Sequence, residues 1–526
     1  MIRISALCAL ALLASAASPQ QRPAYDILIV HGQVYDGDGR LLVGAEVAIR
    51  DGQIVAVGEG LSLRKAARRT IDATGMIVAP GFIDPHTHAG ADLTSADPSR
   101  RANLAWAFQG VTTVVVGNDG DGLTPNSTVI GQTGTNYAVL SGFGRIRRQV
   151  MGDADLPANT MQLTKMRAAV RRDMCAGALG FSAGLYYAPQ SFASTHEVIA
   201  LAEVAGAMGG YYDTHLRDEG RFTVGVDAAL EEALEIGRAA KLPLHIAHIK
   251  ALGPAVWGQS SSMIAKIERA RAAGQRVTAD QYPWDASGTR ISTALLPRST
   301  MDGGMEALRG RLADPVQAKA IELGIDRSIA NRGGADRLLI TGSSGNVGSI
   351  SGKTLAQVAK ERGMTPAQTA IEILRSGDAS LASFNMSATD IEAFAYRDWV
   401  VTGSDGSTGH PRMFASFPKA WDDLVRRGKM EIGRFIARSS GNTARAIGLE
   451  GRGFLRDGMA ADIVVLDPSH IGPMATYLQP TVQSVGVKTL LVAGVPVVEN
   501  GKYTGNLPGK RLRKVPKSAA CSTQRH

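Results

Sequence analysis

The sequence predicts an α/β protein: a (β/α)8 barrel of the TIM type joined to a small β-sandwich that is built from both chain ends. Short apolar runs alternate with amphipathic segments over residues 81–449, which is typical of βα units around a parallel sheet. Strand-like runs separated by Gly and Asp turns occur at both ends of the chain. The length of 526 residues suits one large and one smaller domain.

The first 17 residues have the pattern of a signal peptide. Arg3 precedes an apolar stretch that ends in small residues at 14–17. This pattern predicts a periplasmic or secreted protein, with an uncleaved anchor helix as the alternative. No later segment is apolar for long enough to cross a bilayer, so the mature chain is expected to have no transmembrane span. Cys175 and Cys521 would remain after cleavage, and a bridge between them is possible, although the sequence does not indicate it.

The same pattern of short predicted strands and tight turns occurs in residues 24–80 and 450–512. We expect these two segments to pair into the sandwich. Asp-Gly and similar dipeptides between alternating apolar runs are a hairpin signal. The predicted strands are 25–30, 46–50, 53–57, 461–466 and 489–493. Residues 513–526 form a basic polar tail.

Residues 81–449 contain the predicted barrel. Its clearest strands are 112–116, 243–248 and 277–280, and its clearest helices are 227–240 and 263–273. Such barrels carry their chemistry at the C-terminal ends of the strands. Residues 296–337 are helical and loop-like, and we interpret them as an insertion over the barrel mouth.

His86 and His88 follow an apolar run at 76–80 that predicts a short buried strand. In an extended strand, residues i and i+2 face the same side, so the two imidazoles would lie side by side. Neutral imidazole suits zinc and similar ions. The pair alone is a weak signal, because two histidines at this spacing also arise by chance or on solvated edges.

Other His and Asp side chains follow further strand-like runs, and a barrel would bring them to the same mouth. They are Asp119, His215, His248 and Asp405. A single His at a strand end is usually structural, but so many groups at strand ends predict a metal site. We interpret the remaining histidines at 31, 196, 245 and 470 as structural or exposed.

The composition excludes some classes of function. The net charge is +9, yet no basic stripe with interleaved aromatic residues is present, so nucleic acid is not an expected partner. Part of the charge lies in the tail, which we read as solvated; attraction of anionic substrates or of a membrane surface is the functional alternative.

Several longer motifs resemble the amidohydrolase superfamily and, within it, the N-acyl-D-amino acid deacylase (D-aminoacylase) family. The resemblance extends from about residue 25 to 512 and rests on the stretches 81–88, 110–118, 177–189, 214–220, 248–250, 280–283, 403–406 and 410–412. It implies a (β/α)8 barrel with a sandwich from both chain ends, and metal-dependent cleavage of the amide bond of N-acyl amino acids.

The resemblance implies one or two zinc ions, with manganese or cobalt as alternatives. His86, His88 and Asp405 would hold one ion, and His215 and His248 the other. The family has a cysteine ligand where this chain has Asp119, a harder ligand that favours zinc less strongly than a thiolate. We expect Asp119 to bind metal directly, with hydrogen bonding to a ligand as the alternative. The short loop 406–409, and Phe143 where family members tend to carry His, also indicate an outlying member.

The resemblance implies a role for each residue around the metal. Asp405 would act first as general base toward water and then as general acid toward the leaving amine. The substrate carboxylate would be held by Arg412, whose guanidinium can bind it with two hydrogen bonds, together with Lys250, Tyr282 and Ser287. Tyr186 and Tyr187 would line the acyl or side-chain pocket, and His410 would orient Arg412.

Two alternatives remain beside this hydrolase of N-acyl amino acids. A dipeptidase or cyclic-amide hydrolase could use the same centre, because a fold does not fix its substrate. A non-catalytic binding protein is the other alternative, although a scaffold has no chemical need for converging His and Asp side chains. The expected partner is a small amide that bears a carboxylate, and the sequence is compatible with a homo-oligomer.

Overall fold

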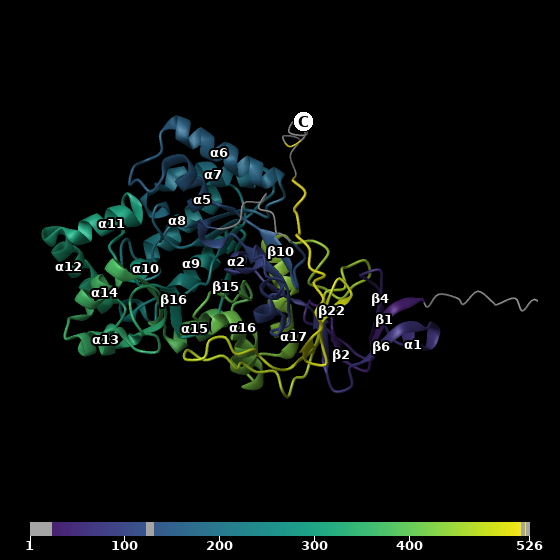
Figure 1. The fold of residues 1–526 in the computed structure, drawn as a ribbon. Coiled ribbons are helices and arrows are strands. Elements are labelled where there is room, and N and C mark those ends of the chain that lie inside the picture. The colour runs from purple at the N-terminus through teal and green to yellow at the C-terminus, as the bar shows by residue number, and fades with distance from the viewer. Residues whose placement is uncertain (1–23, 122–130, 517–520, 522–526) are drawn as a thin grey trace, which may run out of the picture.

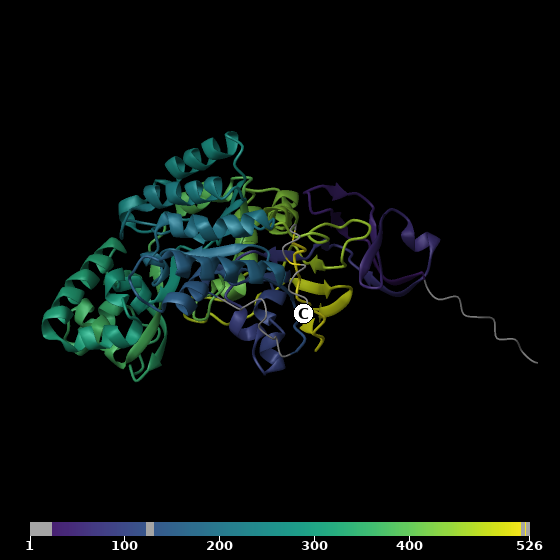
Figure 2. The same ribbon diagram turned by 90° about the horizontal axis from the view of Figure 1, so that it is seen from above.

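The computed structural model describes residues 24–121, 131–516 and 521. Figure 1 shows the strands of the two chain ends, purple and yellow, gathered on one side of the molecule. The helices α11 to α14 form the opposite side, and the view from above in Figure 2 gives the same order. Parallel strands and their helices lie between these two parts.

Two sheets form the part built from the chain ends. One has the order β5-β4-β1-β6, and the other has the order β23-β22-β21-β20-β7-β2-β3. Antiparallel pairing of β7 with β20 places Pro80 opposite Ile463, so both chain ends contribute to the second sheet. The bounds are β1 Tyr25–Val30, β2 Gln33–Tyr35, β3 Leu41–Leu42, β4 Glu46–Arg50, β5 Gln53–Gly58, α1 Leu61–Arg64, β6 Ala67–Asp72, β7 Ile77–Pro80, β20 Ile463–Leu466, β21 Val487–Val492, β22 Val495–Glu499 and β23 Lys502–Tyr503.

The strands predicted at both ends are confirmed, with small shifts of their bounds. The two sheets pack through apolar side chains such as Ile29, Val47 and Ile463, which belong to one buried cluster. The Asp51-Gly52 turn has positive φ at both residues, 50° and 76°, as a two-residue hairpin requires. Local alternation and turn chemistry therefore specify this part of the fold.

Parallel strands from consecutive βα units form the central part. Their pairing follows chain order, from β8 through β9 and β10, and from β11 through β12, β13, β14 and β15 to β19. The last strand returns to the first, because Asp405 N donates a hydrogen bond to His86 O at 2.9 Å and Thr87 forms a parallel bridge with Gly406. The strand bounds are β8 Phe82–Asp84, β9 Val111–Val116, β10 Asn136–Val139, β11 Ser141–Gly142, β12 Phe181–Gly184, β13 Tyr212–His215, β14 Leu244–Ile246, β15 Val277–Gln281 and β19 Val400–Thr402.

Helices cover these strands and share a core with them. Phe143, Phe181 and Leu230 belong to the largest buried apolar cluster, which joins helices to strands. The two helices predicted from amphipathic periodicity are confirmed as α8 and α9. The helix bounds are α2 Gly90–Leu93, α3 Pro98–Arg101, α4 Leu104–Ala107, α5 Phe143–Met151, α6 Thr160–Cys175, α7 Thr195–Ala207, α8 Val226–Ala239, α9 Ser260–Ala272, α15 Ala388–Ala395, α16 Arg412–Ala420, α17 Ile432–Ser439 and α18 Gly441–Ile447.

The chain changes sheets at Gly81, which corrects the expectation that the run at 76–80 leads directly into the histidine pair. β7 belongs to the sandwich, and β8 begins one residue later among the parallel strands. A Cβ atom on Gly81 would lie 2.2 Å from the side chain of Thr112, so only glycine allows this close crossing.

An additional unit lies between β15 and β19. It has an antiparallel sheet in the order β16-β18-β17, with helices packed on a core of its own. The segment predicted as an insertion, 296–337, contains α11 and α12, but the unit extends well beyond it at both ends. The bounds are β16 Ala286–Arg290, α10 Ile291–Leu295, α11 Gly304–Ala313, α12 Pro315–Asn331, β17 Leu338–Gly345, α13 Leu355–Arg362, α14 Pro366–Ser376 and β18 Gly377–Phe384.

The C-terminal segment returns to the parallel strands and ends in a disulfide. Leu512 N donates to Tyr137 O at 2.7 Å, and Lys514 N donates to Gly177 O at 3.2 Å. This path leads toward α6, and Cys521 is bonded to Cys175, with 5.4 Å between the Cα atoms. The structure thus forms the bridge that the sequence leaves possible without indicating it, because the path of the tail is a tertiary feature. In the part of the chain described, no helix is long and apolar enough to span a bilayer.

Candidate metal centre and active site

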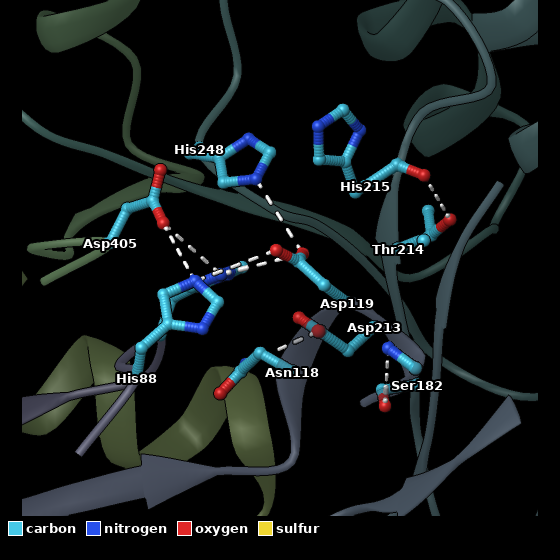
Figure 3. A network of polar contacts seen from close by, with 12 residues as sticks. His88, Asn118, Asp119, Ser182, Asp213, Thr214, His215, His248 and Asp405 are labelled. Atoms are coloured by element: carbon cyan, nitrogen blue, oxygen red, sulfur yellow. Dashed lines mark hydrogen bonds and ion pairs between the residues drawn. The ribbon is translucent and has the colours of Figure 1, made fainter. Parts of the chain in front are cut away.

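The predicted metal ligands meet at one place, at the carboxyl ends of the parallel strands. They are His86 and His88 after β8, Asp119 after β9, His215 at the end of β13, His248 after β14 and Asp405 after β19. Figure 3 shows His88, Asp119, His248 and Asp405 arranged around a common point, with His215 nearby. The topology of the strands thus brings together side chains that are far apart in the sequence.

Asp119 lies at the centre of this cluster. One oxygen, Oδ1, is 3.5 Å from His86 Nε2 and 3.7 Å from His248 Nε2. The other oxygen, Oδ2, is 3.6 Å from His88 Nε2. Asp405 Oδ1 closes the ring, at 3.6 Å from His86 Nε2 and 3.2 Å from His88 Nε2. Ligand atoms from His86, Asp119, His248 and Asp405 all lie within 4.8 Å of one another.

A second group adjoins the first and shares His248 with it. His215, Glu219 and His248 also offer ligand atoms within 4.8 Å of one another. Glu219 Oε2 is 3.6 Å from His215 Nε2, while Glu219 Oε1 is 3.0 Å from His248 Nδ1. The sequence analysis did not assign a role to Glu219. Its place four residues after His215, within the motif at 214–220, was the available signal.

The backbone at this centre adopts conformations that side chains other than glycine rarely take. Asp119 has φ 57°, His248 has φ 33° and Asp405 has φ 48°. Positive φ is uncommon for such residues, and it concentrates where the surrounding structure enforces it. Gly120 N donates to Ser182 Oγ at 3.2 Å, and Gln190 Nε2 donates to Asp119 O at 2.8 Å, so neighbouring elements hold the Asp119 loop in place.

The polar atoms at the centre have few hydrogen-bond partners of their own. Both ring nitrogens of His86, as well as Asp119 Oδ1, are buried without a hydrogen bond. A buried polar atom without a partner costs about 1–3 kcal/mol, so such a cluster is expensive unless something binds it. Imidazole nitrogens and carboxylate oxygens are the ligands of zinc, manganese and cobalt, and the residues therefore fit a divalent metal.

The electrostatics of the centre distinguish His86 from His215. Burial disfavours charge on His86, but the nearby Asp119 and Asp405 carboxylates raise its pKa to about 9 overall. Burial lowers the pKa of His215 to about 4 despite the nearby Glu219 carboxylate. Burial acts against ionisation of Asp119, yet the two facing imidazoles hold its pKa well below the usual range. His215 is therefore neutral at neutral pH, the form in which imidazole binds metal.

Beneath the ligands lies a layer of buried hydrogen bonds that fixes their loops. Asp84 accepts from Ser404 N at 3.0 Å and from Trp106 Nε1 at 3.1 Å, which ties the ends of β8 and β19 together. His245 is bonded to Asp280 Oδ2 at 3.0 Å, as expected for a structural histidine. Asn118, shown with Asp213 in Figure 3, donates to Asp213 Oδ2 at 3.2 Å.

A pocket opens beside the ligands, and all the predicted substrate-binding residues line it. These are Tyr186, Tyr187, Lys250, Tyr282, Ser287 and Arg412. His215, His248 and Asp405 line the same pocket, so it reaches the candidate metal centre. A neighbouring cleft shares Asp405 and Arg412 with this pocket, and His88 and Asp119 also form part of its wall.

Arg412 is already paired within the protein. Its Nη1 lies 2.6 Å from Asp405 Oδ2, and its backbone N donates to His410 Nδ1 at 3.1 Å. His410 thus contacts the backbone of Arg412, and its role in orienting the guanidinium stays a prediction. Arg412 Nε and Tyr282 Oη are buried without a hydrogen-bond partner, and the guanidinium lies 5.0 Å from the Tyr282 ring. These free donors face the same pocket.

Lys250 and the two tyrosines connect the pocket to the second group of ligands. Lys250 Nζ lies 2.6 Å from Glu219 Oε1, and it also donates to His248 Nδ1 at 2.6 Å. The ring of Tyr186 stacks on His215 with 5.3 Å between centroids, and Tyr187 meets His215 edge-on at 4.7 Å. The wall of the pocket thus contacts the candidate ligands directly.

Comparisons with known proteins agree with this geometry. Residues 69–498 match the amidohydrolase family. The chain is 30% identical to a D-aminoacylase of Alcaligenes xylosoxydans xylosoxydans, over 93% of this chain and 98% of the relative. Among solved structures, it is similar to a D-aminoacylase with a binuclear metal centre, at 29% identity, TM-score 0.78 and coverage of 93% and 100%.

A second solved structure carries a ligand. It is the N-acyl-D-glutamate deacylase of Bordetella bronchiseptica in complex with zinc and a phosphonate inhibitor that mimics the tetrahedral intermediate. The identity is 30% and the TM-score 0.76, over 93% of this chain and 99% of the other.

Proposed function

Because the chain belongs to the amidohydrolase family, we propose that it is a metal-dependent hydrolase that cleaves the amide bond of N-acyl amino acids. The observation that carries the proposal is the buried cluster of His86, Asp119, His248 and Asp405, whose ligand atoms lie within 4.8 Å of one another beside a pocket rich in cations.

The resident cofactor is one or two divalent ions, with zinc as the first choice and manganese or cobalt as alternatives. His86, His88 and Asp405 would hold one ion, His215 and His248 would hold the other, and Asp119 would supply a further carboxylate ligand. A metal in this site would lower the pKa of a water and polarise the scissile carbonyl. The central position of Asp119, within 3.7 Å of three imidazole nitrogens, favours direct binding over a supporting hydrogen bond.

Asp405 moves the proton in this proposal. Its Oδ2 is held by Arg412 at 2.6 Å, whereas Oδ1 faces the histidines of the centre. Oδ1 accepts a proton from the attacking water and then donates it to the nitrogen of the leaving amine, so the carboxylate ends each cycle ionised. Arg412 keeps the carboxylate oriented between these two steps.

The substrate carboxylate is held in the wall of the pocket, which His215, His248 and Asp405 also line. Arg412 Nε and Tyr282 Oη provide buried donors without partners, and Lys250 and Ser287 lie in the same wall. A carboxylate bound by several donors at once fixes the amide in position, which is a large part of what an enzyme contributes to rate. Tyr186 and Tyr187 line the space for the acyl group or the amino-acid side chain.

The fold proposed for this function is a closed (β/α)8 barrel with the ligands at its C-terminal mouth. The contacts between Asp405 and His86 and between Thr87 and Gly406, which join the last strand to the first, support closure. We place the domain limits at 24–80, 81–449 and 450–512, as the sequence predicts. The oligomeric state is left open.

The proposed location is the periplasm or the cell exterior. Residues 1–17, the proposed signal peptide, lie outside the described residues. The disulfide between Cys175 and Cys521 supports export, because disulfides form and persist in oxidising compartments.

The test is a hydrolysis screen of both enantiomers of several N-acyl amino acids, dipeptides and cyclic amides, with the purified protein before and after a chelator. We expect metal-dependent cleavage of N-acyl amino acids, restored by zinc, manganese or cobalt. Asp405→Asn should lower kcat by at least about 100-fold while much of the metal is retained, since general acid–base catalysis contributes that much.

Asp398→Asn is the matched control, because Asp398 precedes β19 and its side chain is 88% exposed. It should leave kcat unchanged. If the protein cleaves only dipeptides or only cyclic amides, that class of amide replaces N-acyl amino acids as the proposed substrate. If the protein contains no metal and binds small molecules without hydrolysing them, the alternative of a non-catalytic binding protein is favoured.

A further inference from the structure

Two spaces of different size meet at the candidate metal centre. The pocket lined by Lys250 and Tyr282 has a free volume of about 30 Å³, which is room for about two water molecules. The cleft beside it has a free volume of about 480 Å³, which lies in the range of sites that bind small organic ligands. Asp405 and Arg412 line both spaces, so a molecule bound at the centre can extend from one into the other.

Hydroxyl groups are the commonest polar groups in the wall of the cleft. They belong to the inserted unit and to the loop 406–409, and they are Thr289, Thr293, Thr341, Ser380, Ser407 and Thr408. Ser407 Oγ accepts a hydrogen bond from Arg412 Nη2 at 3.0 Å. The other hydroxyl groups make no hydrogen bond to any residue that the structure describes, so each can both donate to a ligand and accept from it.

Thr341 and Ser380 lie on neighbouring strands of the inserted unit, against the short loop 406–409. Ser380 on β18 pairs with Gly342 on β17, the residue after Thr341. A Cβ atom on Gly409 would lie 3.0 Å from Thr341 Oγ1 and 3.6 Å from Ser380 Cβ. This loop directly follows Asp405 in the sequence, so the proposed general base and the two hydroxyl groups border one continuous cleft.

The two charged side chains of this wall that are not assigned to the centre or the pocket each have an opposite charge nearby. Arg290 Nε lies 2.8 Å from Asp378 Oδ2, and Asp121 Oδ1 lies 3.8 Å from Arg148 Nη1. The wall therefore offers neutral donors and acceptors, which suit a neutral polar group such as an amide. An apolar chain would cover the hydroxyl groups without satisfying them, which is costly.

We propose that the cleft is the subsite for the acyl group, and that it takes a peptidyl chain rather than a fatty acyl chain. The inference rests on the proposed function and names the acyl class of its substrate. With the substrate carboxylate in the pocket and the scissile carbonyl at the centre, the acyl chain continues past Asp405 into the cleft. There its amide N–H and C=O groups form hydrogen bonds with the hydroxyl groups of Thr341 and Ser380.

The reaction is the hydrolysis already proposed. The oxygen of water bonds to the scissile carbonyl carbon, the C–N bond breaks, and a proton passes to the nitrogen of the leaving amine. The products are a free amino acid and a shortened peptide that ends in a carboxylate. Release of the free amino acid therefore measures turnover for every acyl group.

The experiment compares acyl groups of equal length on the amino acid that the hydrolysis screen finds best, in both enantiomers. An acetylglycyl chain is as long as a pentanoyl chain, and an acetylglycylglycyl chain is as long as an octanoyl chain. The N-acetyl derivative gives the reference rate of the centre itself. We expect kcat/KM to favour each peptidyl substrate over its fatty acyl counterpart by at least about tenfold, the value of one or two hydrogen bonds.

Thr341→Val combined with Ser380→Ala removes both hydroxyl groups with little change of volume. The double variant should bring the ratio of peptidyl to fatty acyl turnover to within about threefold of unity, since the hydrogen bonds are lost. Turnover of the N-acetyl derivative should stay within about threefold of wild type. Ser343→Ala is the matched control, because Ser343 also lies on β17 but is exposed and does not line the cleft. It should keep the wild-type ratio.

The outcomes separate this inference from the proposed function. If wild type cleaves the N-acetyl derivative and handles the fatty acyl substrates as well as the peptidyl ones, the inference is overturned and the proposed function stands, even if the double variant does not fold. A folded double variant that keeps the wild-type ratio also overturns the inference, because the hydroxyl groups would then not bind the chain. Absence of turnover for every amide, short or long, overturns the proposed function and the inference together.

Discussion

At the scale of single residues, Asp119 is the side chain that connects the histidines of the candidate metal centre. Its two oxygens face His86, His88 and His248 at 3.5 to 3.7 Å, so one carboxylate contacts both groups of imidazoles. Its backbone has φ 57°, and hydrogen bonds from Gly120 N to Ser182 Oγ and from Gln190 Nε2 to Asp119 O hold the loop. If Asp119 binds metal as proposed, a hard carboxylate at the central position would make the site less selective for zinc than a thiolate.

Asp119→Cys should therefore shift metal preference toward zinc. The thiolate is softer than the carboxylate, so we expect the ratio of zinc affinity to manganese affinity to rise at least about tenfold. Competition dialysis with metal analysis measures the ratio directly and does not depend on turnover. The control is Asp121→Cys, two residues along the same loop, which should leave the ratio unchanged. A ratio unaffected by Asp119→Cys would place Asp119 outside the ligand shell.

Gly81 links the two main parts of the molecule at the scale of elements. β7 ends at Pro80 in the sandwich, and β8 begins at Phe82 among the parallel strands, so one residue joins two sheets. His86 follows only a few positions later. The crossing therefore sets where the first pair of candidate ligands lies relative to the other strands.

Gly81→Ala should destabilise the protein, because the added Cβ would lie 2.2 Å from the side chain of Thr112. Overpacking of this kind costs about 1–3 kcal/mol, measured as a lower free energy of unfolding in urea. Gly58→Ala is the control, since a Cβ there has no neighbour within 4 Å. If both variants unfold at the same urea concentration as wild type, the crossing is not tightly packed.

The disulfide acts at the scale of the whole molecule. It joins α6 to the C-terminal segment across a sequence separation of 346 residues. Just before it, Leu512 and Lys514 make backbone hydrogen bonds to Tyr137 and Gly177. The bridge therefore fastens the C-terminus to the parallel-strand part of the molecule, while the sandwich joins the two ends of the chain.

Replacing both cysteines, Cys175→Ser with Cys521→Ser, should lower the free energy of unfolding by about 2–4 kcal/mol, because a long loop is no longer closed in the unfolded chain. Urea unfolding of oxidised wild type and of the double variant measures the difference. A reducing agent should bring wild type to the stability of the variant and leave the variant unchanged. A wild-type protein indifferent to reductant would contradict the role given to the bridge.

Local sequence patterns determined many of the strands and helices of this protein and the positions of its candidate metal ligands. Alternating apolar runs and the Asp51-Gly52 turn specify the strands of both chain ends, and 3.6-residue periodicity specifies α8 and α9. The positions of the candidate ligands, each just after a strand-like run, were also visible, because the carboxyl ends of parallel strands converge. These signals act over a few residues, so the sequence alone contains them.

Only the tertiary structure decided which side chains touch. It places Glu219 against His248, pairs Arg412 with Asp405 and brings Cys521 to Cys175. It also separates the strand predicted at 76–80 from the histidine pair by a change of sheet at Gly81, where the neighbour that excludes a Cβ, Thr112, lies on another strand. Each of these contacts joins segments that no local pattern relates, and their energy depends on burial and pairing that exist only once the chain has closed on itself.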